Sequence, residues 1–121
     1  MKPLFDTNVL IDYLLNVEEA RAELSLYRQA AISVISWMEV MAGARPDNEQ
    51  ATRRFLNRFD RIGLDAQIAE RAVAVRRERR IKLPDAIIWA TANCGALMLV
   101  TRNSKDFPAG EPWVRIPYSR R

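Results

Sequence analysis

The stretch Pro3-Leu4-Phe5-Asp6-Thr7-Asn8-Val9-Leu10-Ile11 decides the expected fold, because a short apolar run ends there on a carboxylate. This pattern predicts a first strand with Asp6 at its carboxyl end, and in open α/β sheets such ends line the ligand crevice. Three later segments each carry one acid in a comparable setting. They are Ser36-Trp37-Met38-Glu39, Leu83-Pro84-Asp85-Ala86 and Thr101-Arg102-Asn103-Ser104-Lys105-Asp106-Phe107.

Apolar runs and helical repeats alternate along the chain, which predicts a parallel sheet between two layers of helices. The expected strands cover residues 3–6, 31–35, 62–64, 96–101 and 113–116. The expected helices cover residues 7–15, 18–30, 36–41, 48–59, 66–80 and 84–93. We therefore expect a single α/β domain over residues 1–121, a three-layer α/β/α sandwich with a short, mainly parallel sheet.

Composition narrows the class of protein. The 121 residues are 49% hydrophobic, enough for a real core, and the formal net charge is +4. The lone Cys94 excludes an intrachain disulfide, and residues 1–6 are too short for a signal-peptide core, so a cytoplasmic location is expected. The longest uncharged stretch, 86–101, is interrupted by Asn93 and Gly95, so no membrane span is expected. The basic balance fits either a polyanionic partner or a solvated surface.

The four spaced acids predict a site for a hard cation. Carboxylates that converge raise one another's pKa unless a cation neutralises them, and Mg²⁺ or Mn²⁺ does so with carboxylates and waters. Zinc is less favoured because the chain has no histidine and a single cysteine. Such a site on a basic protein indicates phosphoryl chemistry, and more specifically a hydrolytic phosphodiesterase.

Each acid also has a purely local explanation. Asp6 or Thr7 could cap the following helix, Ser36 with Glu39 matches a capping box, and Asp85 suits the first turn of its helix. Asp106 could be an ordinary turn residue.

The order of these motifs resembles the PIN domain, and specifically the VapC-type toxins of bacterial toxin–antitoxin pairs. The segments 5–10, 36–39, 83–90 and 99–107 are similar to the four acid-bearing segments of that family. The resemblance implies a small α/β/α sandwich with Mg²⁺- or Mn²⁺-dependent endoribonuclease activity. It also implies an RNA substrate, a cognate antitoxin protein and a homodimer.

The resemblance assigns residues to the site. Asp6, Glu39 and Asp85 would form the catalytic, metal-binding core, and Asp106 is the better candidate for the fourth acid. A further group, whose alternative roles are helix caps and strand-end hydroxyls, would orient the carboxylates or a metal-bound water. It consists of Thr7, Asn8, Ser36, Thr101 and Asn103, the last of which is also a direct oxygen ligand candidate.

Rival classes fit less well. A haloacid-dehalogenase-type phosphatase needs a second aspartate at the position of Asn8, and a receiver-like domain needs paired acids after the first strand. A catalytically silent PIN-like module that binds RNA or protein remains the alternative. The basic run 76–80 with Lys82 fits either a solvated helix end or a phosphate contact. Core and dimer surface both remain open for four leucines, namely Leu10, Leu14, Leu24 and Leu26.

Overall fold

The computed structural model describes residues 1–120 of the chain. Within them, strands and helices alternate along most of the sequence. The strands are β1 (Pro3–Phe5), β2 (Ala31–Ser33), β3 (Asp60–Ile62), β4 (Met98–Val100) and β5 (Val114–Arg115). The helices are α1 (Thr7–Leu14), α2 (Glu18–Ser25), α3 (Val34–Ala42), α4 (Glu49–Leu56), α5 (Ala66–Arg79) and α6 (Leu83–Cys94).

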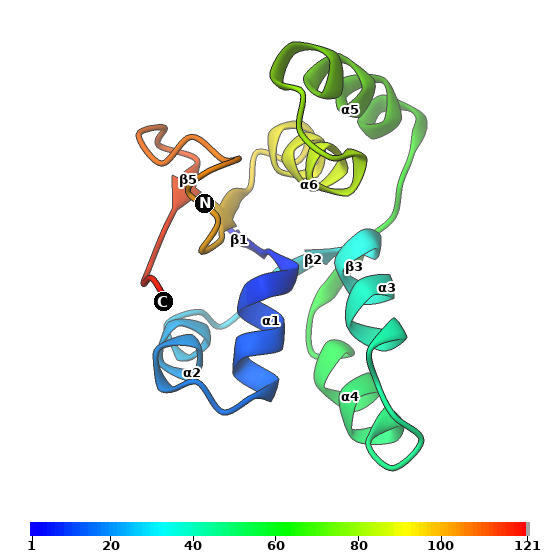
Figure 1. The fold of residues 1–121 in the computed structure, drawn as a ribbon, viewed down its shortest axis with the longest axis vertical. Coiled ribbons are helices and arrows are strands. Elements are labelled where there is room, and N and C mark those ends of the chain that lie inside the picture. Colours follow the sequence, from blue (N-terminus) through cyan, green and yellow to red (C-terminus); the bar gives the residue numbers. More distant parts are fainter. Residues whose placement is uncertain (121) are drawn as a thin grey trace.

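The strands form one parallel sheet in the order β3-β2-β1-β4-β5. The central strand β1 pairs Phe5 with Val100 of β4 on one side and Leu4 with Ala31 of β2 on the other. Helices cover both faces of the sheet, with α5 and α6 on one face and α1 and α2 on the other (Figure 1). This confirms the predicted three-layer α/β/α sandwich with a parallel sheet.

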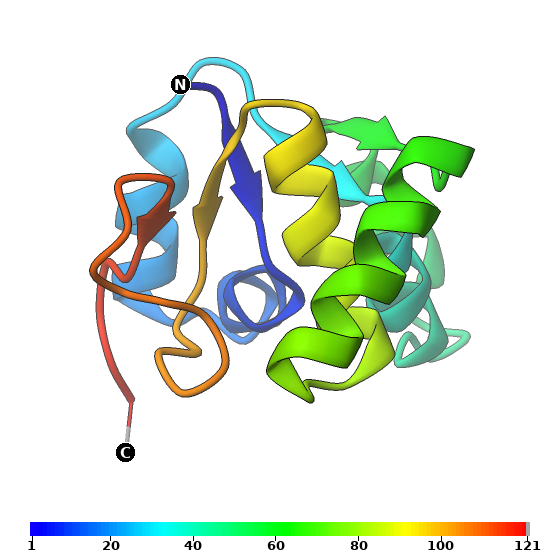
Figure 2. The same ribbon diagram turned by 90° about the horizontal axis from the view of Figure 1, so that it is seen from above.

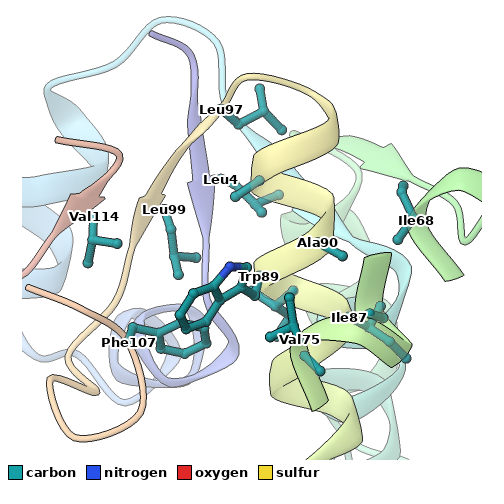
Figure 3. Packing of buried hydrophobic residues seen from close by; sticks show 14 of the residues in the cluster. Leu4, Ile68, Val75, Ile87, Trp89, Ala90, Leu97, Leu99, Phe107 and Val114 are labelled. Atoms are coloured by element: carbon teal, nitrogen blue, oxygen red, sulfur yellow. The ribbon is translucent and has the colours of Figure 1, made fainter. Parts of the chain in front are cut away.

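One face of the sheet packs against α5 and α6. Leu4, Leu99 and Val114 lie on this face in neighbouring strands, next to Trp89 of α6 (Figure 3). Every residue of α6 from 86 to 92 is buried. A helix that is apolar all round is buried on all sides, and α6 is enclosed by α5, by the sheet and by the loop that carries Phe107. The buried stretch begins directly after Asp85, which lies half-buried in the first turn of α6.

The opposite face packs against the remaining helices. Phe5, Ile32 and Val100 each follow a residue of the first face, because side chains alternate between faces along a strand. They contact a second apolar cluster from α1, α2, α3 and α4. Its buried members are Val9, Leu10, Ala20, Leu24, Val40, Phe55 and Leu56.

Several predicted boundaries are wrong. Strand β2 ends at Ser33 rather than at residue 35, and helix α4 ends at Leu56 rather than at residue 59. Helix α2 ends at Ser25 rather than at residue 30; the Ser25 hydroxyl donates to the Ala22 carbonyl (2.7 Å), a local bond that competes with the helical pattern. Strand β3 lies two residues earlier than expected, because it pairs Asp60 with Ala31 of β2. Its first two residues are exposed, so no apolar run marked its position.

The structure also shows which of the four leucines lie in the core. Of the four leucines, Leu10 and Leu24 belong to the core, whereas Leu14 and Leu26 are exposed. Within residues 1–120, no helix combines the length and the apolar character needed to cross a bilayer.

Candidate functional site

The carboxyl edge of the sheet brings the first and last acid-bearing segments together. β1 and β4 run side by side in the same direction (Figure 2), so the residues that follow them, Asp6 and Thr101, are neighbours. The Thr101 hydroxyl donates to Asp6 Oδ2 (2.7 Å), and the Asp6 amide donates to the Val100 carbonyl (2.9 Å). Thr101 is completely buried, so this hydroxyl is fixed in place for one carboxylate.

Asp6 is the N-cap of α1. Its Oδ1 accepts from the Thr7 amide (2.7 Å), while its Oδ2 also accepts from Asn8 Nδ2 (3.2 Å). Of the two capping candidates, the structure thus selects Asp6 over Thr7. The side chain is only 4% exposed, so a carboxylate is held in the protein interior by neutral donors.

Glu39 projects from α3, whose start differs from the prediction. The N-cap is Ser33, whose hydroxyl accepts from the Ile35 amide (3.1 Å), so the helix begins at Val34. The expected capping box of Ser36 with Glu39 is therefore wrong. Glu39 lies in the second turn of the helix, where the Thr7 hydroxyl donates to its Oε1 (2.7 Å).

Ser36 is an interior residue of the same helix. It is completely buried, and its hydroxyl lies 2.9 Å from the Thr7 hydroxyl. Thr7 thereby connects the first turn of α1 to α3 through both Ser36 and Glu39.

Asp85 and Asp106 reach the same edge from two other segments. Asp85 lies in the first turn of α6, behind Pro84, as predicted. Asp106 lies in the loop after β4, where its Oδ2 accepts from Asn103 Nδ2 (3.1 Å) and its amide donates to Asn103 Oδ1 (3.1 Å). The Asn103 amide in turn donates to the Thr101 hydroxyl (3.0 Å). Asn103 thus orients the acid that follows it.

Comparison with known proteins supplies the family. The model of the PIN domain matches residues 4–109. The chain belongs to the PIN-domain family. It is 36% identical over 116 residues to a Mycobacterium tuberculosis protein named Ribonuclease VapC10, covering 89% of this chain and 87% of that protein.

Solved structures agree with this assignment. A toxin–antitoxin complex from Klebsiella pneumoniae contains a chain that is 51% identical, with a TM-score of 0.92 over 98% of this chain and 100% of that one. A DNA-bound VapBC complex from Salmonella typhimurium contains a chain that is 26% identical, with a TM-score of 0.77 over 99% and 96%.

The acids of this PIN domain affect one another electrostatically. Burial raises the pKa of Asp6 to about 6, against the hydrogen bonds from Thr101 and Thr7, and the charges of Asp85 and Glu39 add to the rise. Burial also raises the pKa of Asp85, with further contributions from the charges of Asp106 and Glu39, while Lys82 opposes the rise. All four acids therefore belong to one electrostatic cluster.

The donor set fits a divalent metal ion. Within residues 1–120, no lysine or arginine forms an ion pair with any of the four acids. Asp6 is buried, Asp85 and Asp106 are half-buried and Glu39 is exposed. A hard cation relieves the repulsion between neighbouring carboxylates that lack a cationic partner. Across residues 1–120, no three acidic side chains lie close enough to one another to coordinate a single ion.

Sequence reasoning missed a second buried acid close to the site. Asp12 lies on α1 and is 1% exposed. It accepts hydrogen bonds from Arg102, from the Tyr118 hydroxyl (2.8 Å) and from Arg120. A helical spacing offered a signal, because Asn8 and Asp12 are four residues apart and so share one face of α1. The partners lie 90 to 108 residues away in the sequence and had no comparable signal.

Proposed function

We propose that this PIN domain is a Mg²⁺- or Mn²⁺-dependent endoribonuclease that acts as the toxin of a toxin–antitoxin pair. The observation that carries the proposal is Asp6, a buried carboxylate with a raised pKa, surrounded by other acids and by neutral donors. The similarity to a protein named as a ribonuclease supports this reading. The expected RNA substrate, homodimer and cytoplasmic location are predictions that belong to the same proposal.

Asp6, Glu39, Asp85 and Asp106 would hold the metal ion. When bound, the ion supplies an activated water for attack on a phosphodiester phosphorus and neutralises the phosphate oxygens. The other residues of the site keep the four carboxylates oriented. Four of them donate side-chain hydrogen bonds to the acids. Thr101 and Asn8 donate to Asp6, Thr7 donates to Glu39, and Asn103 donates to Asp106.

The nuclease proposal is tested with the purified chain and total cellular RNA. We expect cleavage with Mn²⁺ or Mg²⁺ and none with a chelator. Asp6→Asn and Asp85→Asn should each lower the cleavage rate by more than about 100-fold, since even residues that only support metal ligands cost 10–100-fold. Mapping of the cut sites on the same RNA would identify the substrate.

The matched control is Glu70→Gln, which removes an exposed acid on the outer helix α5. Its rate should equal that of the unchanged chain. Full activity in Asp6→Asn and Asp85→Asn would contradict the assigned site. An unchanged chain that binds RNA without cutting it under any metal would instead support the silent binding module.

An apolar groove beside the acidic cluster supports the antitoxin part of the proposal. It has a volume of about 490 Å³ and runs between α1, α3 and α4. Exposed Ile11 and Leu14 of α1 line it together with Leu15, the C-cap of α1, and Val40. Glu39 lines the same groove. This combination fits an amphipathic helical segment whose apolar residues enter the groove and whose arginine reaches the acids.

Co-expression with the product of the neighbouring reading frame tests this part. We expect a stable, inactive complex, and light scattering on the isolated chain measures whether it forms a homodimer. Leu14→Asp in the groove should break the complex, whereas Leu26→Asp, at an exposed leucine that does not line the groove, should not. A complex that survives Leu14→Asp would place the partner elsewhere. A chain that cuts RNA but is harmless when overproduced and captures no partner would refute the toxin role alone.

A further inference from the structure

In the part of the chain that the structure describes, Asp12 accepts more side-chain hydrogen bonds than any other acid. Its Oδ2 accepts from Arg102 Nε (2.6 Å) and the Tyr118 hydroxyl, and its Oδ1 accepts from Arg120 Nη1 (3.0 Å). Burial alone would raise the pKa of Asp12, but these donors hold it below its ordinary value. We refer to Asp12, Arg102, Tyr118 and Arg120 as the Asp12 cluster.

Arg102 connects this cluster to the candidate site. It stands between Thr101, which donates to Asp6, and Asn103, which orients Asp106. Its own amide donates to Asn8 Oδ1 (3.2 Å), one helical turn before Asp12. Arg102 is therefore held to α1 at two points, by its main chain and by its side chain.

The loop 101–106 depends on such contacts because it has no regular secondary structure. Its beginning is fixed by β4 and its end by Phe107, which is buried in the core. Between these two points, Ser104 and Lys105 are exposed. The Thr101 hydroxyl holds the first residue of the loop to Asp6, and Arg102 adds the attachment of the next residue to α1.

We propose that Asp12 is a positioning residue for the candidate site. Through Arg102, Asp12 holds the loop 101–106, and with it Asn103 and Asp106, at a fixed position relative to Asp6. Tyr118 and Arg120 complete the arrangement, so the C-terminal segment supports the site from a distance. The inference rests on the proposed metal site, because the position of Asp106 relative to Asp6 matters only if both carboxylates bind the same metal ion.

The chain contains a matched control for a merely structural role. Glu23 on α2 is 4% exposed and accepts from Arg115 Nε (2.6 Å) and Nη2 (2.9 Å) and from the Tyr27 hydroxyl (2.9 Å). This is the same chemistry at similar burial, but none of these side-chain bonds involves the loop 101–106. Arg115 contacts the loop only through its main-chain carbonyl, which accepts from the Thr101 amide (3.1 Å) beside the paired strands β4 and β5. Loss of either carboxylate should destabilise the fold, and only loss of Asp12 should disturb the site.

The test compares Asp12→Asn, Arg102→Met and their double variant with Glu23→Gln in the full chain. Titration calorimetry measures Mn²⁺ binding, and hydrogen exchange measures protection of the Asn103 and Asp106 amides without metal. We expect Asp12→Asn and Arg102→Met to weaken Mn²⁺ binding by about tenfold or more. The double variant should bind Mn²⁺ no more weakly than Asp12→Asn alone, since both changes remove the Asp12–Arg102 interaction. Both amides should exchange faster in these variants and normally in Glu23→Gln.

Two results would overturn the inference. One is Mn²⁺ affinity and amide protection in Asp12→Asn equal to those of Glu23→Gln. The other is additive losses in the double variant. If Asp12→Asn does not fold, Mn²⁺ binding and amide exchange are compared between Arg102→Met, at a partly exposed side chain, and Glu23→Gln. If the unchanged chain binds no Mn²⁺, the proposed metal site fails by itself, and the exchange measurements still decide whether Asp12 holds the loop.

Discussion

The raised pKa of Asp6 makes the stability of the metal-free chain depend on pH in an unusual direction. Burial and neighbouring charges raise this pKa from its ordinary value of 3.8 to about 6. Between these two values the folded chain binds a proton that the unfolded chain has already released. Stability from this group is therefore fully present below pH 3.8 and is lost as pH rises through about 6.

The size of the effect follows from the same two values. Moving a pKa from 3.8 to about 6 corresponds to about 3 kcal/mol over the full range. Between pH 7 and pH 5, the free energy of unfolding should rise by about 1.3 kcal/mol, since protonation at pH 5 is nearly complete only in the folded chain. For a chain of this length, that rise corresponds to about 5 °C in Tm.

Other acids with a shifted pKa do not cancel the rise in stability between pH 7 and pH 5. Hydrogen bonds from arginine and tyrosine, opposing the effect of burial, hold the pKa values of Asp12 and Glu23 below their ordinary values of 3.8 and 4.5. Their contributions are lost as pH falls, mainly below pH 5. Asp85, whose pKa is raised, acts in the same direction as Asp6. The stability of the metal-free chain should thus pass through a maximum between about pH 4 and 5.

Urea unfolding followed by tryptophan fluorescence measures this directly, because Trp37, Trp89 and Trp113 are at least partly buried. The difference in unfolding free energy between the unchanged chain and Asp6→Asn isolates the contribution of Asp6. With saturating Mn²⁺, the dependence should reverse, since metal binding requires the ionised carboxylate. A difference between the two chains that does not change from pH 7 to pH 5 would refute the reasoning.

Three shorter predictions concern single residues. Asp85→Asn should lower the pKa of Asp6 in an NMR titration of the metal-free chain, because it removes a neighbouring negative charge; an unchanged pKa would contradict the electrostatic cluster. Leu99→Ala should cost about 2–5 kcal/mol in urea unfolding, because Leu99 is completely buried in the central part of the sheet. Arg80→Gly should raise the free energy of unfolding by about 0.5–1 kcal/mol, because Arg80 ends α5 with a φ of 58°, a left-handed conformation that costs little in glycine. A lower free energy of unfolding would show that contacts of the arginine side chain outweigh this backbone cost.

The sequence predicted the central strands β1 and β4 well because the signals for these strands are local. An apolar run that ends on a polar residue marks a strand that ends at a site, and this placed Asp6 and Thr101 at the same edge. Helix α6 was equally clear, since Pro84 suits its first turn and Gly95 follows its last residue. These features depend on a few adjacent residues and on the two periodicities of the backbone.

Helix starts were predicted less well where two polar residues competed for the same role. Ser33 and Ser36 could each cap α3, and Ser33 does so because β2 ends there, paired with β3. At α4, Asp47 with Gln50 matches a capping box, but the cap position is Asn48, whose side chain accepts from the Arg45 amide (2.8 Å). Strand pairing and loop geometry decided both cases, and neither is visible in a local pattern.

The Asp12 cluster could not have been predicted, because it depends on pairing across the fold. Arg102 and Asp12 are 90 residues apart, and Arg120 is 108 residues away. No local periodicity links such positions, so only the folded chain shows which arginine neutralises which acid. The same limit applies to Glu23 and Arg115, which are 92 residues apart.

The structure separates two kinds of buried acid by the chemistry of their partners. Asp12 and Glu23 are bound by arginines, which neutralise the carboxylate and lower its pKa despite burial. Asp6 is bound by a hydroxyl, an amide side chain and a backbone N–H, which orient the carboxylate but leave its charge. A charge left uncompensated in the interior costs stability unless something else binds it. The chain has 19 basic residues, yet in residues 1–120 none forms an ion pair with Asp6. This selective absence, more than the number of acids, is the observation on which the proposed metal site at the carboxyl edge of the sheet rests.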